Sequence, residues 1–377
     1  MKKLFLFLLA LSLLNGLIFF GISTHVAFAE KVRVLVVPGH EPHYGGANFG
    51  KLYEHDLTVE LGKYLETFLK NNSRYQVTVS RDADSWNGML ASYFNSHMNE
   101  ITAWQQQAKK TAPAFSSSGE QSTSTVMHVS APSFAAFRLF GITKWANENK
   151  TDLMIHLHLN DTPERKKNMA GKYSGFSIYV PALQNGNSSS TKGIANAVFK
   201  RLSLYNPVSD YPPESKGIIQ DPDLIALGVN NTANSASMLI EYDYLYQPQF
   251  VNAKVRSVAL KDLAYQTYLG VEDYFSKVDN ISVASRYYPS RVYVWKTRVT
   301  SMGPNNPKDI YALQTALIMD GDYPPIGKTK NECPHSGNIG ACTKASLAIF
   351  QKKYGITGES FGGKKTFAKL NAIYMKK

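Results

Sequence analysis

Short runs of β-branched and aliphatic residues alternate with amphipathic segments along most of this chain, and this alternation limits the fold more than any other feature. Residues 31–37 (KVRVLVV) predict a buried strand that ends at Pro38-Gly39. Residues 54–70 carry apolar side chains at helical spacing. Strands that alternate with helices indicate an α/β fold, a mostly parallel twisted sheet flanked by helices. Further strands are predicted at 76–80, 152–160, 175–181 and 237–241, and further helices at 134–149, 194–204 and 254–275.

Two regions depart from this rhythm, which suits a chain with two domains or one large domain and a satellite. Residues 85–132 form an insertion whose first half has a helical pattern and whose Ser/Thr-rich stretch, 116–125, we expect to be mobile. Such an insertion can be a lid or a solvated decoration. After a linker at 280–306, residues 307–377 predict a small C-terminal helical domain, with helices at 310–317, 344–354 and 366–374.

The N-terminus has the three parts of a secretory signal peptide. Lys2 and Lys3 precede an apolar run at 4–20, and Ala27-Phe28-Ala29 ends the segment. A membrane anchor is the alternative, because the run approaches the roughly 20 residues that span a bilayer. The two alanines favour cleavage after residue 29. We then expect a soluble chain without a stable membrane span, exported to the periplasm, the cell wall or the extracellular space.

The charge and the two cysteines bear on the partner and the compartment, although the charge alone decides neither. The formal net charge is +12, and residues 307–377 contribute 11 lysines against 5 acidic residues. This bias favours an anionic partner, and export makes the anionic cell wall a better fit than nucleic acid. Cys333 and Cys342 predict one disulfide in an oxidising compartment, with free thiols as the alternative. Two thiols without a CxxC spacing make a poor zinc site.

Three polar residues lie at the predicted ends of strands. His40 directly follows the first strand, His158 lies near the end of the strand at 152–160, and Glu241 ends the strand at 237–241. Sites in open parallel sheets form beyond the carboxyl ends of the strands. We therefore expect these side chains to lie at one edge of the sheet.

A fourth candidate, Glu54, opens the first predicted helix. Its spacing from Leu57 and Leu61 points it along the face that packs on the sheet. An unpaired buried charge is costly, and a metal ion can supply the partner. Two histidines and one carboxylate are the usual ligands of a catalytic zinc ion, and a second carboxylate, here Glu241, can then move the proton of a water. Because each of these residues taken singly can be structural, spacing alone indicates no more than a metal hydrolase.

Three segments around these residues carry a more specific pattern. The first, VLVVPGHEPHYGGANFGKLYEHDLTVELGKYL, has a strand, a PGH turn, a Gly-Ala loop and a Glu-led helix, and KWANENKTDLMIHLHLND and SASMLIEYDYLYQP follow in order. Over residues 31–275, with 85–132 as an extra insertion, the chain resembles the zinc-dependent N-acetylmuramoyl-L-alanine amidases. The resemblance implies cleavage of the amide between N-acetylmuramic acid and L-alanine in peptidoglycan. It implies zinc ligands at His40, Glu54 and His158 and a general base and acid at Glu241.

The chain departs from this family at several positions. Glu41 replaces the usual glycine after His40, and Tyr242-Asp243-Tyr244 replaces the family's Leu-Gly-Phe after the catalytic glutamate. His156 stands where the family generally has a small polar residue. Since it shares one face of the strand with His158, it can orient a ligand or fill core space. None of these changes removes a predicted ligand or the base.

The C-terminal region carries a second resemblance. DIYALQTAL, AIFQKKYGITG and FGGKKTFAKL, within residues 307–373, resemble the peptidoglycan-binding helical module of wall hydrolases. A small helical cap without a ligand is the alternative. The resemblance predicts that this module keeps the enzyme on its insoluble substrate.

Two other functions stay open at this point. One is a non-catalytic wall-binding or regulatory protein that keeps the fold, and the other is a zinc peptidase acting on the peptide stem. The insertion adds a prediction of its own, because residues 86–104 carry an apolar stripe at near-helical spacing. We predict that this stripe lines or caps the catalytic groove and limits access by long glycan strands.

Overall fold

A mixed sheet of six strands forms the centre of the computed structural model. The strand order is β4-β1-β5-β8-β6-β7. Neighbours from β4 to β8 are parallel, β6 is antiparallel to β8, and β7 is parallel to β6. The prediction of a mostly parallel sheet flanked by helices is confirmed. The structure describes residues 30–116, 132–162, 165–182, 187–222, 224–227, 232, 235–276, 293–295, 306–359 and 361–374.

The predicted elements match the observed ones closely, with one strand of the central sheet and a short separate hairpin missed and some ends displaced. Strand β7, Ile218–Asp221, has no counterpart in the prediction, because four residues are too few to show a period. The strands are β1 (Val32–Pro38), β4 (Tyr75–Val79), β5 (Leu153–Asn160), β6 (Ser177–Pro181), β7 and β8 (Ala236–Tyr244), with a separate hairpin of β2 (Asn48–Phe49) and β3 (Leu52–Tyr53). The helices of the same region are α2 (Glu54–Lys70), α3 (Gly88–Ser96), α4 (Met98–Ser116), α5 (Ser133–Glu148), α6 (Ser188–Tyr205), η1 (Pro212–Glu214), η2 (Ile225–Leu227), α7 (Pro248–Val251) and α8 (Ala253–Phe275).

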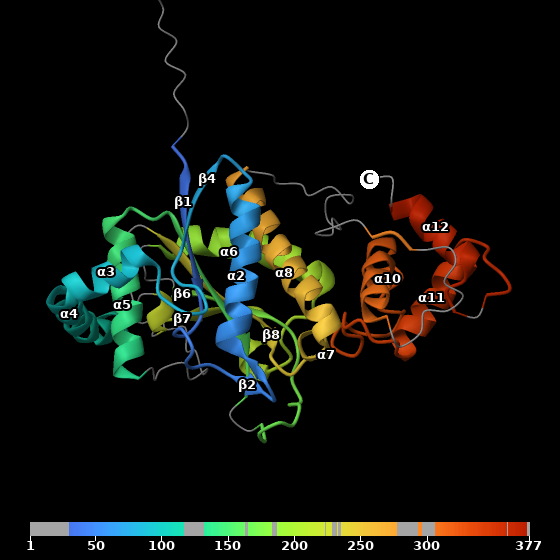
Figure 1. The fold of residues 1–377 in the computed structure, drawn as a ribbon, viewed down its shortest axis with the longest axis horizontal. Coiled ribbons are helices and arrows are strands. Elements are labelled where there is room, and N and C mark those ends of the chain that lie inside the picture. The colour runs from blue at the N-terminus through green and yellow to red at the C-terminus, as the bar shows by residue number, and fades with distance from the viewer. Residues whose placement is uncertain are drawn as a thin grey trace, which may run out of the picture. The chain divides into compact units, whose positions relative to one another are not determined.

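Helices cover both faces of the sheet. On one face α2, α6 and α8 bury the largest apolar core, and α2 and α8 lie side by side along the strands (Figure 1). On the other face α3, α4 and α5 form a separate group over β1 and β5. Because successive side chains of a strand point to opposite faces, each central strand contributes to both layers. Alternate side chains of the same strand therefore pack in opposite layers.

The insertion predicted at 85–132 forms helices in its described part. The apolar stripe divides between α3 and α4, which meet at His97. Leu90, Phe94 and Ile101 are fully buried in one core with α5 and the sheet. The stripe therefore packs mainly on α5 and the sheet. Residues 117–131, which include most of the Ser/Thr-rich stretch, lie outside the described residues.

The C-terminal residues fold around a second core, which also includes Tyr205 of α6 and Trp295. Apolar side chains of three helices, such as Leu317, Phe350 and Phe367, are buried together. Cys333 and Cys342 form the predicted disulfide. The three helices are α10 (Pro307–Asp320), α11 (Ala341–Lys353) and α12 (Lys364–Tyr374), as the sequence predicts.

Two predictions about the chain's other segments fall largely outside the described residues. The predicted signal peptide at 1–29 does so entirely, and the linker at 280–306 does so except for 293–295 and 306. Among the helices that the structure describes, none combines the length and the apolar character that a bilayer crossing requires.

Candidate active site

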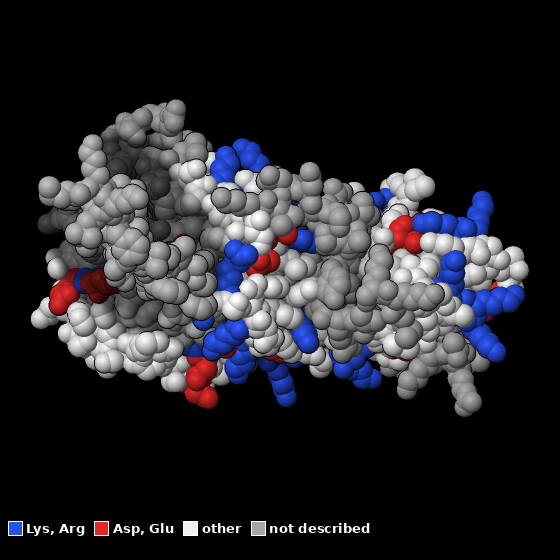
Figure 2. Space-filling model, turned by 90° about the horizontal axis from the view of Figure 1, so that it is seen from above, with Lys and Arg blue, Asp and Glu red and all other residues white. Residues whose placement is uncertain are grey.

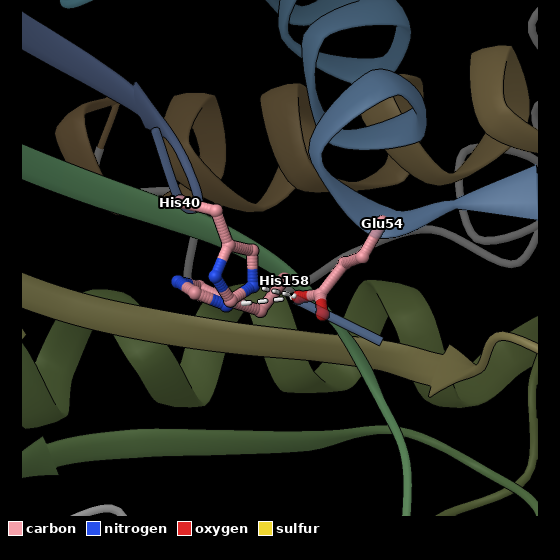
Figure 3. Close-up of side chains that lie close together, drawn as sticks. All are labelled: His40, Glu54 and His158. Carbon is pink, nitrogen blue, oxygen red and sulfur yellow. Dashed lines mark hydrogen bonds and ion pairs between the residues drawn. The ribbon is translucent and has the colours of Figure 1, made fainter. Parts of the chain in front are cut away.

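The three predicted metal ligands converge near the carboxyl ends of the parallel strands. His40 follows β1, His158 lies in β5, and Glu54 is the first residue of α2. Nε2 of His40 lies 2.8 Å and Nδ1 of His158 lies 3.0 Å from Oε1 of Glu54. Both imidazole rings are turned toward this carboxylate (Figure 3). One ligand atom from each residue lies within 4.8 Å of the others, so the structure brings the three together.

The turn after β1 fixes the position of His40. Its backbone has a φ of 68°, in the left-handed region that costs energy for a residue with a side chain. The Gly39 N–H donates to the Leu157 carbonyl over 2.8 Å, and the Arg81 guanidinium donates to the carbonyls of Pro38 and Gly39. Burial lowers the pKa of Arg81 to about 10, so the side chain keeps its charge at neutral pH. Sequence reasoning missed Arg81, because one arginine after a strand has no distinctive spacing.

Two glycines leave room for the ligands. A Cβ at Gly39 would lie 2.5 Å from Cε1 of His158. A Cβ at Gly46 would lie 2.7 Å from Oε2 of Glu54 and 2.8 Å from Nε2 of His40. Gly46 also has a φ of 81°, a conformation that glycine adopts without strain. A side chain at either position would displace a ligand.

Hydrogen bonds and charge keep Glu54 ionised although it is buried. The Ala47 N–H donates to Oε2 over 2.8 Å, and the Leu159 N–H donates to Oε1 over 3.1 Å. Burial opposes ionisation, but the interaction with His40 and the hydrogen bond from His158 outweigh it and hold the pKa of Glu54 well below its usual range. The carboxylate therefore remains an anionic ligand well into the acidic range.

The donor set fits a metal ion. Nε2 of His40 is buried and makes no hydrogen bond with any residue that the structure describes, although the Glu54 carboxylate lies close to it. Buried polar atoms normally have a partner, and an imidazole nitrogen can find one in a metal ion. Two imidazoles and one carboxylate are a ligand set typical of a catalytic zinc ion. The cluster of His40, Glu54 and His158 can therefore hold a metal.

Glu241 lies beside this cluster, and one oxygen of its carboxyl group has no partner among the described residues. It pairs in register with His158 of the neighbouring strand, and only 4% of its surface is exposed. Among the described residues none bonds to its Oε2. Burial and the charges of Glu54 and Glu214 raise its pKa well above the usual range. The prediction that Glu241 ends its strand is wrong, because β8 continues to Tyr244 and places Glu241 inside the strand.

These residues line one cavity of about 520 Å³. Its polar end contains His40, Glu54, His158 and Glu241, and Trp86 is the member of the predicted stripe among its lining residues. The cavity continues between the sheet, α5 and η2. The wall there is mainly apolar, with Val37, Leu139, Ile142, Leu224, Ile225, Ala226 and Leu239.

A buried network beside Glu241 was not predicted. The Glu214 carboxylate accepts hydrogen bonds from Asn160 Nδ2 over 2.8 Å, from the Tyr179 hydroxyl over 2.8 Å and from Ser209 Oγ over 2.6 Å. Asn160 lines the cavity, and Glu214 thus fixes one of its walls. Glu214 follows two prolines in η1 and lies on no periodic segment, so its sequence has no feature that could have marked it.

His156 also lines the cavity, on the same face of β5 as His158. It is 1% exposed, and neither ring nitrogen forms a hydrogen bond within the described part of the chain. Burial, with the nearby charge of His158, lowers its pKa to about 3. His156 is therefore a neutral imidazole at the cavity wall.

Comparison with known proteins gives one family match. The family model described as N-acetylmuramoyl-L-alanine amidase matches residues 34–273. No curated protein matches the chain. Similar solved structures include an N-acetylmuramoyl-L-alanine amidase from Clostridium difficile 630 (18% identity, 65% of this chain and 97% of that chain, TM-score 0.41) and the CwlD amidase from Clostridioides difficile in complex with the GerS lipoprotein (16%, 66% and 100%, 0.42). The amidase Ami1 from Mycobacterium smegmatis is another (14%, 66% and 100%, 0.42). These identities and TM-scores carry no conclusion about function.

Proposed function

The chain belongs to the N-acetylmuramoyl-L-alanine amidase family, and from this premise we propose that His40, Glu54 and His158 hold a zinc ion while Glu241 is the general base and acid. The family's reaction is hydrolysis of the amide bond between N-acetylmuramic acid and L-alanine in peptidoglycan, and this chain is such a hydrolase. The observation that carries the assignment of roles is the convergence of the three ligands beside a second carboxyl group, whose Oε2 has no partner among the described residues.

Each residue would contribute through a different property. His40 and His158 offer imidazole nitrogens, and Glu54 adds one negative charge that its hydrogen bonds keep in place. Zinc at this point supplies Lewis acidity, which lowers the pKa of a bound water to roughly 7 and polarises a carbonyl. The three side chains are fixed by β1, β5 and α2, so the site needs little rearrangement to bind a metal.

Glu241 would move the proton. Burial and the charges of Glu54 and Glu214 raise its pKa, and a cation nearby would lower it. In the ionised form Glu241 accepts a proton from the attacking water. In the protonated form it donates that proton to the departing nitrogen of L-alanine, as general acid–base catalysis requires.

The C-terminal module would retain the enzyme on the wall. Its described helices carry an excess of basic side chains, and many of these project from the surface that Figure 2 shows. An anionic polymer is the partner that such a surface attracts. Deleting residues 307–377 should weaken co-sedimentation with purified sacculi and spare hydrolysis of small soluble muropeptides. Unchanged co-sedimentation by a folded truncated chain would leave the module a structural cap.

The site of action would be outside the cytoplasm. The basic start, the apolar run at 4–20 and the Ala27-Phe28-Ala29 end support a cleaved signal peptide, and the Cys333–Cys342 disulfide is suited to an oxidising compartment. N-terminal sequencing of the secreted protein should begin at Glu30.

Analysis of the products from sacculi tests the reaction. The zinc-loaded chain should release peptide stems with a new N-terminal L-alanine, detected by mass spectrometry. Cleavage inside the stem would identify a peptidase instead. The absence of any product from a folded, zinc-loaded chain would identify a wall-binding protein.

A further inference from the structure

One arginine in the cavity wall has no acceptor among the residues that the structure describes. Arg138, on α5, is partly buried and lines the cavity that contains the His40, Glu54 and His158 cluster. Its guanidinium forms no hydrogen bond or ion pair with any other described residue. Arg81, the other arginine near the site, differs in that its donors are used by backbone carbonyls. Arg81 thus supports the turn, whereas the donors of Arg138 remain available to a ligand.

Aromatic rings fix the position of this guanidinium. Its Cζ lies 4.5 Å from the centre of the Phe94 ring and 5.8 Å from that of Phe137. Phe94 is fully buried in α3, so its ring is a rigid support. A cation over a ring keeps its in-plane N–H groups free to form hydrogen bonds. The insertion therefore contributes to the cavity by supporting Arg138.

Among the described residues, no carboxylate forms an ion pair with Arg138. Glu41 is near enough for its charge to interact with that of Arg138, but it does not pair with the guanidinium and accepts a hydrogen bond from Trp86 Nε1 over 3.0 Å. Oε1 of Glu54 already lies within 3.0 Å of a ring nitrogen of each histidine in the metal cluster. Arg138 thus offers a positive charge in the same cavity as the reacting groups, and an anionic group of a ligand is its natural partner.

We propose that Arg138 binds the α-carboxylate of the second residue of the substrate's peptide stem. The proposal rests on the proposed function, in which the nitrogen of L-alanine lies beside Glu241. In a stem whose second residue is a glutamate linked through its side chain, the α-carboxyl group of that residue is free or amidated. It lies one residue, roughly 3.5 Å of extended chain, beyond L-alanine. A guanidinium binds a carboxylate with two parallel hydrogen bonds, which an amide cannot accept in the same way.

Soluble substrates that differ in one group test this assignment. The full zinc-loaded chain is assayed on two muramoyl tripeptides, one with a free and one with an amidated α-carboxyl group on the second residue. The wild type should prefer the free carboxylate by roughly 10- to 100-fold in kcat/KM, the value of a charged hydrogen-bonded contact, mainly through KM. Arg138→Gln should abolish this preference, and Arg138→Lys should retain part of it. Lys200→Gln, an exposed change of equal charge on α6, should keep the wild-type preference.

Binding measurements separate this proposal from the proposed function. Calorimetry with Glu241→Gln, which needs no turnover, should show tighter binding of the free-carboxylate tripeptide and loss of the difference when Arg138→Gln is added. That result supports the carboxylate contact even if the wild type fails to hydrolyse either substrate, a failure that would reject the amidase reaction alone. Equal binding of both tripeptides by Glu241→Gln would overturn the role of Arg138. So would equal losses on both substrates in Arg138→Gln, whose fold is checked by circular dichroism.

Discussion

The two faces of the central sheet are built from the same strands but differ in what their residues do. On the face under α2, α6 and α8, strand β5 contributes Leu153, Ile155 and Leu157 to a continuous apolar core. On the opposite face the same strand presents His156 and His158 to a cavity. The alternation of a strand puts neighbouring residues in different environments. The first face holds the larger apolar core, whereas the second combines a smaller core with the chemistry.

The two faces therefore differ in what they require of the sequence. The first face requires only a pattern of apolar residues, whereas the second requires a particular residue at each position. Many apolar residues of suitable size can fill the first face, since cores tolerate volume-conserving exchange. The second face needs particular side chains, because a nitrogen or a carboxylate has to reach a defined point. Neighbouring residues on one strand should therefore respond differently to the same substitution.

Alanine at two adjacent positions of β5 should give the largest contrast. His158→Ala removes a proposed ligand, and we expect turnover to fall by several powers of ten with little change in stability. Leu157→Ala opens a cavity in the buried core, so the free energy of unfolding should fall by about 2–5 kcal/mol while the folded protein keeps its turnover. Denaturant titration and a muropeptide assay measure both. If the two variants lose activity in equal measure, the division between the faces fails.

Glu241 gives the next contrast. Glu241→Gln keeps the shape of the side chain and removes the base, so turnover should fall by roughly 10²–10⁴-fold with zinc content unchanged. Ile240→Val, on the apolar face of the same strand, should cost about 0.5–1.5 kcal/mol of stability and leave turnover near the wild-type value. Near-normal turnover in Glu241→Gln would place the base on another residue.

Two glycines in the loop between β1 and α2 separate backbone strain from damage to the site. Gly46 and Gly50 both have positive φ, but only a Cβ at Gly46 meets Glu54 and His40, whereas a Cβ at Gly50 meets no described atom within 4 Å. Alanine at either position should cost about 1–2 kcal/mol of stability through strain. Gly46→Ala should in addition weaken zinc binding, by roughly tenfold or more if a single ligand is displaced. Competition with a zinc chelator measures the zinc affinity. Equal zinc affinities in the two variants would show that Gly46 is not needed to leave room for Glu54 and His40.

The smallest expected effect concerns Asp243, on the site face of β8. Burial raises its pKa to about 7, although hydrogen bonds from Tyr244, Gly175 and Gln249 favour the charged form. Between about pH 4 and 7 the folded chain then keeps a proton that the unfolded chain has lost, so this group makes stability fall as pH rises. Asp243→Asn should flatten that fall in metal-free protein, measured by urea unfolding from acid to neutral pH. Parallel stability profiles of the two proteins would show that the pKa of Asp243 is the same in the folded and the unfolded chain.

The sequence predicts the apolar face well and the site only in part. The alternation in β5 is visible as LMIHLHLN, and the apolar side chains of α2 recur at helical spacing, so both elements and their faces follow from period alone. Strand β8 is buried along its whole length, so no alternation marks where Glu241 points or where the strand ends. Its role came from resemblance, whereas its position beside His158 comes from the pairing of β5 and β8.

The side chains that support the site could not be predicted from the sequence. Arg81, Glu214 and Arg138 act through contacts with residues distant in the chain, and none lies at a diagnostic spacing. The insertion illustrates the same limit. Its apolar stripe predicted a helix next to the groove, but the division into α3 and α4 and the support of Arg138 by Phe94 depend on packing against α5.

Zinc stoichiometry is the most direct test of the central claim that His40, Glu54 and His158 form a metal site. Elemental analysis of dialysed wild type, His40→Ala, His158→Ala and the control Leu157→Ala measures it in the same preparation. We expect one zinc per chain in the wild type and in Leu157→Ala, and none in the two histidine variants. Stoichiometric zinc in either histidine variant, with the fold intact, would contradict the assignment.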